Sequence, residues 1–282
     1  MRQRVLTGVV FALVMAALVL PGYWWPYLPL MLLLLVHWLA SAELAAAFAG
    51  QSPGPSRLAV HSGLILLLIV PLLAAAGLPV SHAISLLSGL LWLLMLLILI
   101  VSLIRSGPDQ LPAALVGAAL LAYLTLPLTA GAVLLFQFEQ GWVWFVIGLF
   151  SPWVSDVAAF FAGSLFGRRK IVPRISPKKT VAGFVGGLAG SVVLLTPLLL
   201  WLSADARSAW LRWTIALIAP LLLSVAAQFG DWLASGIKRC CGLKDFGHLL
   251  PGHGGVMDRF DSALLTLPFA LVLAVAYNFL IS

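Results

Sequence analysis

The densest group of polar side chains lies between Gly230 and Asp261, in a chain in which only 9% of the residues are charged. It holds four aspartates and, from Lys238 onward, four cations: Asp231, Asp245, Asp258, Asp261, Lys238, Arg239, Lys244 and Arg259. Mg²⁺ usually binds one or two carboxylates and completes its octahedron with water and substrate phosphate. The cations would neutralise phosphate charge. The segment therefore predicts a Mg²⁺-dependent site for a phosphate-bearing substrate.

The aspartates of this segment fall at expected helix ends. Asp231 closes one helix, whereas Asp258 and Asp261 open the next on one face. Carboxylates on two such ends could share one Mg²⁺ if the ends meet at the membrane surface. The alternative is a solvated loop without a ligand.

Glycine and histidine residues in the same segment are typical of a loop that closes around a ligand. Gly252, Gly254 and Gly255 let the backbone approach it closely. His248 and His253 could suggest zinc, but the cysteine spacing of a zinc site is missing. We expect these histidines to form hydrogen bonds instead.

A second candidate is the basic segment 167–179, with six cationic residues in thirteen positions and no acid. Its end, Ser176-Pro-Lys-Lys-Thr180, directly precedes the glycine-rich start of an expected helix. Free N–H groups at a helix start favour anions, so Lys178, Lys179 and the hydroxyls predict a phosphate site. The sequence lacks the GxxxxGK[ST] pattern of a P-loop. The alternative is a loop that only sets the membrane orientation or binds lipid headgroups.

The third candidate is Asp156, which falls inside an expected membrane helix, about 15 Å from its end. A carboxylate at this depth is costly unless it faces a polar cavity, a cation or a basic partner. We interpret Asp156 as a functional residue. A carboxylate that only packs two helices together is the alternative.

Composition identifies the elements that carry these residues. The 282 residues are 62% hydrophobic, with a mean hydropathy of +1.11, too apolar for a soluble fold. Stretches of about 17–25 apolar residues can cross a bilayer as helices. We expect an all-α polytopic membrane protein with about nine transmembrane helices. The expected spans are 5–20, 27–49, 59–76, 82–104, 112–136, 142–166, 180–203, 209–233 and 262–281.

Charge placement orients these spans. With the N-terminus inside, fourteen Lys and Arg residues fall on the inner side, and only Arg207 and Arg212 remain outside. The positive-inside rule therefore predicts an N-inside, C-outside topology, with the polar segments facing the cytoplasm. Basic residues in short loops do not indicate nucleic-acid binding. We expect N-terminal transmembrane helices over 1–140 and a catalytic region over 141–282, with cytoplasmic loops 167–179 and 236–261.

The run from Ser235 to Asp261 resembles the signature of the phosphatidate cytidylyltransferase (CDP-diacylglycerol synthase) family. It reads Ser235-x-Ile-Lys-Arg-x4-Lys244-Asp-x-Gly-x2-Leu-Pro-x-His253-Gly-Gly-Val-x-Asp258-Arg-Phe-Asp261. The resemblance extends to Asp156, to the Ser-Pro-Lys-Lys-Thr segment and to Glu43. It implies a homodimeric enzyme of the bacterial inner membrane that joins CTP to phosphatidic acid. It also implies Mg²⁺ held by Asp231 and Asp258, with K⁺ as an optional second cation.

The residues and the resemblance together give a full set of candidate site residues. The candidate catalytic residues are Asp156, Lys178, Lys179, Lys238, Arg239, Lys244, Asp245, His253, Arg259 and Asp261. The candidate substrate-binding residues are Ser176, Thr180, Ser235, Gly254 and Gly255, and the metal ligands are Asp231 and Asp258.

Two alternatives stay open at this point. The family often carries acids at the positions of Ala182 and Ala234, a tyrosine at Phe160 and a basic residue at Ser164. These departures leave room for a CTP-dependent transferase that acts on another lipid phosphate. The other alternative is an ion-coupled transporter in which Asp156 and Asp231 line the ion path. The sequence lacks the paired broken helices that many transporters show.

Overall fold

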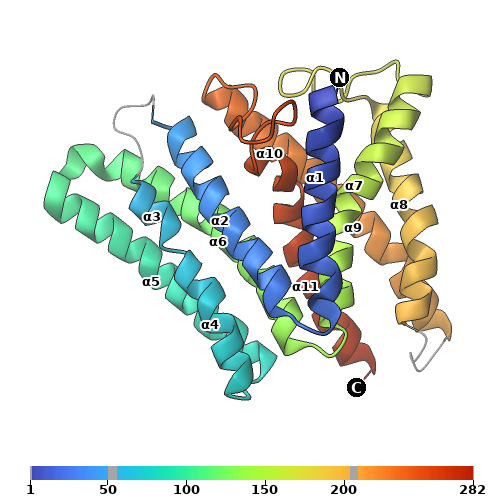
Figure 1. Ribbon diagram of the computed structural model, residues 1–282, viewed down its shortest axis with the longest axis horizontal. Coiled ribbons are helices and arrows are strands. Elements are labelled where there is room, and N and C mark those ends of the chain that lie inside the picture. The colour runs from blue at the N-terminus through green and yellow to red at the C-terminus, as the bar shows by residue number, and fades with distance from the viewer. Residues whose placement is uncertain (1, 50–55, 204–208, 282) are drawn as a thin grey trace. The chain divides into compact units, whose positions relative to one another are not determined.

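A computed structural model describes residues 2–49, 56–203 and 209–281 of the protein (Figure 1). These residues form helices and connecting turns, with no strand among them. The helices are α1 Arg2–Val19, α2 Tyr27–Ala47, α3 Arg57–His61, α4 Leu64–Ala75, α5 Val80–Ser106, α6 Leu111–Gln137, α7 Gly141–Phe166, α8 Val181–Leu202, α9 Ala209–Cys240, α10 Met257–Phe260 and α11 Ala263–Ile281. Short 3₁₀ turns lie at Leu20–Tyr23 (η1) and Pro108–Gln110 (η2). Arg207, predicted to lie on the outer side, is outside the described residues.

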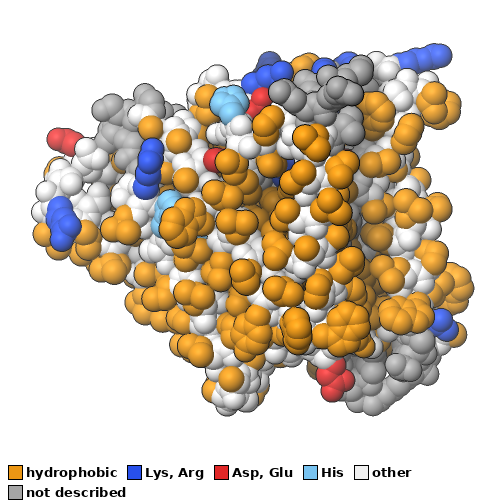
Figure 2. All heavy atoms as spheres, in the orientation of Figure 1, with side chains coloured by type: hydrophobic (Ala, Val, Ile, Leu, Met, Phe, Trp, Pro, Cys, Tyr) orange, Lys and Arg blue, Asp and Glu red, His pale blue; other side chains and the backbone are white. Residues whose placement is uncertain are grey.

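Nine helical segments of the described chain are long and apolar enough to cross a membrane. Each overlaps one of the nine expected spans, so the all-α fold class and the approximate span positions are confirmed. Hydrophobic side chains cover most of the face shown in Figure 2. Such an exterior is stable only when lipid surrounds it.

The chain divides into two compact units. Unit 1 comprises Met1–Val143 and Cys240–Phe260, and unit 2 comprises Trp144–Arg239 and Asp261–Ser282. In unit 1, α2, α4 and α5 all pack against α6. The buried positions of α6 include Ala114, Gly117 and Ala118, small residues that let neighbouring helices approach closely.

The third expected span is two helices rather than one. α3 ends at His61, and α4 begins at Leu64. At the break, a side chain on Gly63 would overlap Thr125 Oγ1 and approach His37 Nε2. The latter two atoms are hydrogen-bonded at 3.0 Å. Glycine is therefore required where the span bends against this buried polar pair.

Unit 2 consists of α8, α9, α11 and nearly all of α7. Side-chain hydroxyls link these helices: Thr266 of α11 donates to Gly148 O of α7 at 2.5 Å, and Thr196 of α8 donates to Ala216 O of α9 at 3.0 Å. Tyr277 donates from α11 to Leu202 O at 2.9 Å. Hydroxyl-to-carbonyl bonds of this kind hold helices together where the hydrophobic effect is weak.

Glycines let α7 and α8 pack closely. A Cβ on Gly186 or Gly190 would overlap the Cβ atoms of Ala162 or Ala158. We expect Gly186→Ala to destabilise the protein by about 1–3 kcal/mol, because the added methyl forces the helices apart. Thermal melting in detergent would measure the change. Gly89 of α5 is the matched control, since a Cβ there meets nothing within 4 Å.

In that control, Gly89→Ala should leave the melting temperature unchanged or raise it, because alanine favours helix more than glycine does. Equal melting of both variants would contradict close packing at Gly186.

The structure corrects the expected end of the eighth span. α9 continues to Cys240 instead of stopping at 233, so Asp231 lies inside the helix rather than closing it. Gly242 lies two residues beyond the end of the helix, and its φ of +69° favours glycine there. The last turns of α9 carry charged residues that hydropathy does not recognise as part of a span. The expected loop 236–261 therefore begins after Cys240, and α10 forms its last residues.

Candidate active site

Unit 2 contains a cavity of about 580 Å³ between α7, the basic segment and the helices α8 and α9. Six of the predicted site residues line it: Asp156, Ser176, Lys178, Lys179, Thr180 and Asp231. They come from three separate parts of the sequence. The structure thus brings the intramembrane carboxylate Asp156, the Ser-Pro-Lys-Lys-Thr segment and Asp231, the first aspartate of the polar segment 230–261, into one cavity.

Two of the charged side chains of this cavity form an ion pair. Lys179 Nζ forms an ion pair with Asp231 Oδ2, and each side chain remains about one quarter exposed. Asp156 interacts electrostatically with both partners. The cavity therefore combines two carboxylates with one paired lysine and one exposed lysine, Lys178. A groove of mixed charge such as this can hold both an anionic phosphate and a cation.

Two further predicted residues extend this charge cluster inside unit 2. Lys238 and Asp261 are both buried, and Asp261 interacts electrostatically with Asp231, Lys238 and Asp156. One oxygen of the Asp261 carboxylate accepts hydrogen bonds from Ser262 N at 2.7 Å and Ser262 Oγ at 3.2 Å. Buried charges require such partners. Unit 2 thus gathers three carboxylates, Asp156, Asp231 and Asp261, and three lysines, Lys178, Lys179 and Lys238.

The basic segment is folded into a tight turn at the start of α8. Ile171 N donates to Lys179 O at 3.1 Å, and Val181 N donates to Arg169 O at 2.9 Å. Thr180 is the N-cap residue of α8, and its hydroxyl oxygen accepts the N–H of Gly183 at 3.1 Å. This turn directs Lys178 and Lys179 toward the cavity, although Thr180 itself serves the helix end.

Unit 1 holds the rest of the signature region. Asp258 Oδ2 accepts the N–H groups of Phe246 at 2.8 Å and Gly255 at 3.0 Å. Arg259 Nε donates to His253 O at 2.8 Å. Segment 246–258, which we call the signature loop, is therefore folded around Asp258. One carboxylate oxygen of this predicted metal ligand is used in shaping the loop.

Glu43 of α2 holds the signature loop from the other side. Its two carboxylate oxygens accept the N–H groups of Val256 at 2.9 Å and Met257 at 2.8 Å. A Cβ on Gly255 would overlap this carboxylate, and Gly254 has a φ of +83°. The two glycines predicted to bind substrate are thus also required by the fold of the loop.

The other predicted residues are placed as follows. Ser235 is half-buried and Arg239 exposed on α9 in unit 2, while Lys244, Asp245 and His253 belong to unit 1, the first two exposed. Asp231 lies in unit 2 and Asp258 in unit 1. Their shared Mg²⁺ stays a prediction.

Sequence reasoning missed one polar residue of the cavity. Gln228 of α9 lines it, and its amide donates to Phe184 O at 3.3 Å. A single amide inside the apolar part of a membrane helix is costly without partners, and this isolation was the available signal.

The donor chemistry of the site suits a hard cation. Its acidic groups are carboxylates, the ligands that Mg²⁺ and K⁺ prefer over imidazole or thiolate. The described residues contain no group of three or more His, Cys, Asp or Glu side chains arranged around a metal position. Mg²⁺ fits such a site because it takes few protein ligands and fills the rest with water and phosphate.

Comparison with known proteins decides the family. The model of the Cytidylyltransferase family matches residues 2–277. The chain belongs to this family. The match spans both units, including all predicted site residues.

Individual relatives in the cytidylyltransferase family carry a more specific name. Proteins named phosphatidate cytidylyltransferase from Staphylococcus saprophyticus and Staphylococcus epidermidis are 42% and 38% identical over 138 residues, 49% of this chain and 51% of each relative. One from Staphylococcus aureus is 41% identical over 123 residues, 44% of this chain and 45% of the relative. The chain thus spans about half the length of the curated relatives it matches. Membership of the cytidylyltransferase family is consistent with the resemblance of residues 235–261 to the phosphatidate cytidylyltransferase signature. It does not favour the alternative of an ion-coupled transporter.

Proposed function

We propose that the protein transfers CMP from CTP to phosphatidic acid, giving CDP-diacylglycerol and pyrophosphate. The observation that supports this most is the cavity of unit 2, where Lys178 and Lys179 share one space with Asp156 and Asp231. It lies in an apolar helical protein of the cytidylyltransferase family. The relatives named phosphatidate cytidylyltransferase support the choice of lipid.

The reaction requires charge neutralisation more than proton transfer. A phosphate monoester has a second pKa of about 6, so phosphatidic acid is largely dianionic at neutral pH. Its phosphate oxygen forms a bond to the α-phosphorus of CTP, and the bond from that phosphorus to the β-phosphate oxygen breaks. Pyrophosphate leaves with the electron pair. No general base is needed in this step.

The cationic side chains of the chain position the phosphates. Lys178 and Lys179 lie at the cavity of unit 2, and Lys238, Arg239, Lys244 and Arg259 are the other candidates for phosphate binding. Positioning and charge stabilisation dominate phosphoryl-type transfers. When bound, Mg²⁺ would be held by Asp231 and Asp258 and would neutralise phosphate charge, with K⁺ as an optional second cation.

The decisive experiment measures CMP transfer by the purified protein in lipid nanodiscs. With CTP labelled in its cytidine, phosphatidic acid and Mg²⁺, we expect label in the lipid fraction and an equal amount of pyrophosphate. Separate reactions contain a polyprenyl phosphate or no acceptor. Label only with the polyprenyl phosphate would favour the transferase for another lipid. No label in any lipid would overturn the enzyme assignment.

We further propose a homodimer in the bacterial inner membrane, with the polar segments of both units facing the cytoplasm. The resemblance and the distribution of Lys and Arg support this orientation. Mass measurement of the protein in nanodiscs tests the dimer. A monomer with full CMP-transfer activity would contradict it.

A natural thiol tests the orientation. Cys240 is a free, exposed cysteine at the end of α9. We expect a membrane-impermeant maleimide to label it in inside-out vesicles and not in intact spheroplasts. Burial and the neighbouring Cys240 raise the pKa of the Cys241 thiol, so Cys241 should react more slowly at neutral pH. A Cys240→Ser variant is the control. Labelling of Cys240 from the periplasmic side would contradict the predicted N-inside topology.

A further inference from the structure

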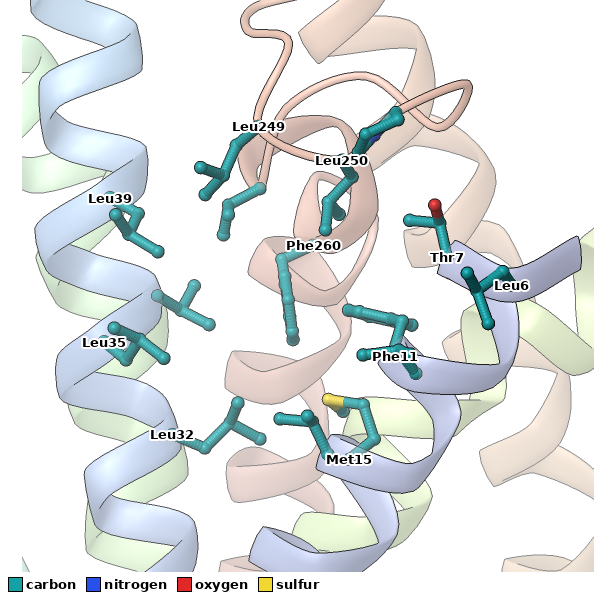
Figure 3. Close-up of a pocket in the computed structure, with 15 residues that line it drawn as sticks. Leu6, Thr7, Phe11, Met15, Leu32, Leu35, Leu39, Leu249, Leu250 and Phe260 are labelled. Carbon is teal, nitrogen blue, oxygen red and sulfur yellow. The ribbon is translucent and has the colours of Figure 1, made fainter. Parts of the chain in front are cut away.

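Unit 1 contains an apolar cavity of about 430 Å³ that the chemistry above does not use. Its walls are α1 and α2, and its end is closed by residues 249–251 of the signature loop together with Val256 and Phe260. Figure 3 shows Leu32, Leu35 and Leu39 of α2 pointing across the space toward Phe11 and Met15 of α1. We call this cavity the α1–α2 slot.

The lining of the slot selects an apolar occupant. Of the fifteen lining residues, Thr7 is the only one with a polar side chain. Protein interiors rarely keep a space of this size empty, and an apolar cavity does not hold ordered water. Leu6, Val10 and Leu35 are exposed, so the slot opens sideways toward the surrounding lipid. A lipid chain can therefore enter it without crossing a polar surface.

The length of the slot suits one acyl chain. The lining residues of α1 extend from Leu6 to Met15, about 14 Å along the helix. This equals about half of the 30 Å hydrocarbon core, which is the depth of one leaflet. Phe260 stands between the walls, with its ring edge-on to Phe11 at a centroid distance of 6.2 Å. The aromatic pair lines the slot next to the signature loop.

Charge distinguishes the two ends of the slot. At the signature-loop end, the His253 ring faces Gly8 of α1, where an added Cβ would lie 3.7 Å from the ring atoms Cε1 and Nε2. The Nδ1 atom of His253 is buried, without a hydrogen-bond partner among the described residues. Arg259 is bound to the backbone of the same residue. The other end, at Met15 and Leu32, is apolar. An amphiphile with an anionic headgroup matches this polarity.

We propose that the α1–α2 slot binds one acyl chain of the phosphatidic acid substrate, with its phosphate at the signature-loop end. This inference rests on the proposed function, because it names where part of that lipid substrate binds. The signature loop then has two roles: Leu249, Leu250 and Pro251 contact the acyl chain, while His253, together with Arg259 of α10, lies on the headgroup side. Recognition of the lipid depends on helices of the N-terminal half.

The test uses binding and turnover together. Phosphatidic acid with a photoreactive diazirine in its acyl chain is added to the protein in nanodiscs, and labelled peptides are identified by mass spectrometry. We expect label on residues 6–15 and 32–39. Leu35→Trp fills the slot and should reduce this labelling about tenfold or more, since each lost methylene contact weakens binding severalfold. Label confined to other helices would overturn the inference.

Leu13→Trp is the matched control. Leu13 lies on α1, is 64% exposed compared with 48% for Leu35, and does not line the slot. We expect it to leave labelling and KM unchanged. In Leu35→Trp, KM should rise about tenfold for long-chain phosphatidic acid but not for the dihexanoyl form or for CTP. Equal effects of the two tryptophans, or an equal rise for both chain lengths, would contradict the slot.

A phosphatidylcholine probe with the same diazirine chain identifies the headgroup requirement. It should label the slot about tenfold less, because it lacks the dianionic monoester. Equal labelling by both probes would make the slot a general lipid site and overturn its assignment to the substrate. Failure of the proposed function is separate: CMP transfer would then be absent in the unmodified protein, while slot labelling is measured without CTP.

Discussion

Changing Asp231 to Asn should reduce CMP transfer at least about a thousandfold, the largest effect we expect from a single substitution. The amide keeps the size of the side chain but removes the charge that pairs with Lys179 and that would hold Mg²⁺. Asp258→Asn should act similarly, since its amide oxygen can still accept the N–H groups of Phe246 and Gly255. The measurement is label transferred from CTP to phosphatidic acid.

Two further variants separate catalysis from folding. Asp109→Asn changes an exposed acid in η2, outside the site, and should leave activity within about twofold. The double variant Lys179→Met/Asp231→Asn leaves neither partner of the ion pair charged. It should therefore restore any lost thermal stability without restoring turnover. If turnover returned in the double variant, Asp231 would be a structural partner of Lys179 and not a metal ligand.

Changing Glu43 to Gln should open the signature loop. The carboxylate accepts two backbone N–H groups, from Val256 and Met257, whereas the amide has one acceptor oxygen and turns its NH₂ toward the other N–H. One unsatisfied buried N–H costs about 1–3 kcal/mol, or about 5- to 150-fold in the equilibrium constant between the closed and the open loop. We expect proteolysis within 246–258 to accelerate by up to this factor, because cleavage follows the population of the open loop, and we expect activity to fall.

The control for this variant is Glu139→Gln. Glu139 is exposed in the turn between α6 and α7, so its substitution should change neither protease sensitivity nor activity. An unchanged cleavage rate of the loop in Glu43→Gln would show that the two hydrogen bonds do not hold it closed.

The membrane spans were predictable because length and hydropathy alone decide whether a helix can cross a bilayer. The same measure failed at the end of α9, where Lys238 and Arg239 continue the helix beyond its apolar part. It also failed at Gly63, because the break between α3 and α4 depends on close contact with Thr125 and His37. Hydropathy contains no information about such contacts.

The sequence predicted which residue types form the candidate site, but not which residues form ion pairs and hydrogen bonds with one another. The spacing of carboxylates and lysines indicated phosphate chemistry, and the structure places Asp156, Lys178, Lys179 and Asp231 in one cavity. The ion pair of Lys179 with Asp231 joins residues 52 positions apart, and Glu43 binds the backbone 213 positions away. Neither partner choice follows from local pattern, because both depend on how the helices pack.

The discontinuity of unit 1 has a consequence for how the protein is made. Its two parts, Met1–Val143 and Cys240–Phe260, flank the main segment of unit 2 in the sequence. A chain emerges from the ribosome N-terminus first, and its domains generally fold in that order. Unit 1 cannot follow this rule, since Glu43 must wait for Val256 and Met257 to be synthesised after Trp144–Arg239. Unit 1 is therefore completed late in biogenesis, and a chain that ends before residue 256 lacks the two N–H groups that the Glu43 carboxylate accepts.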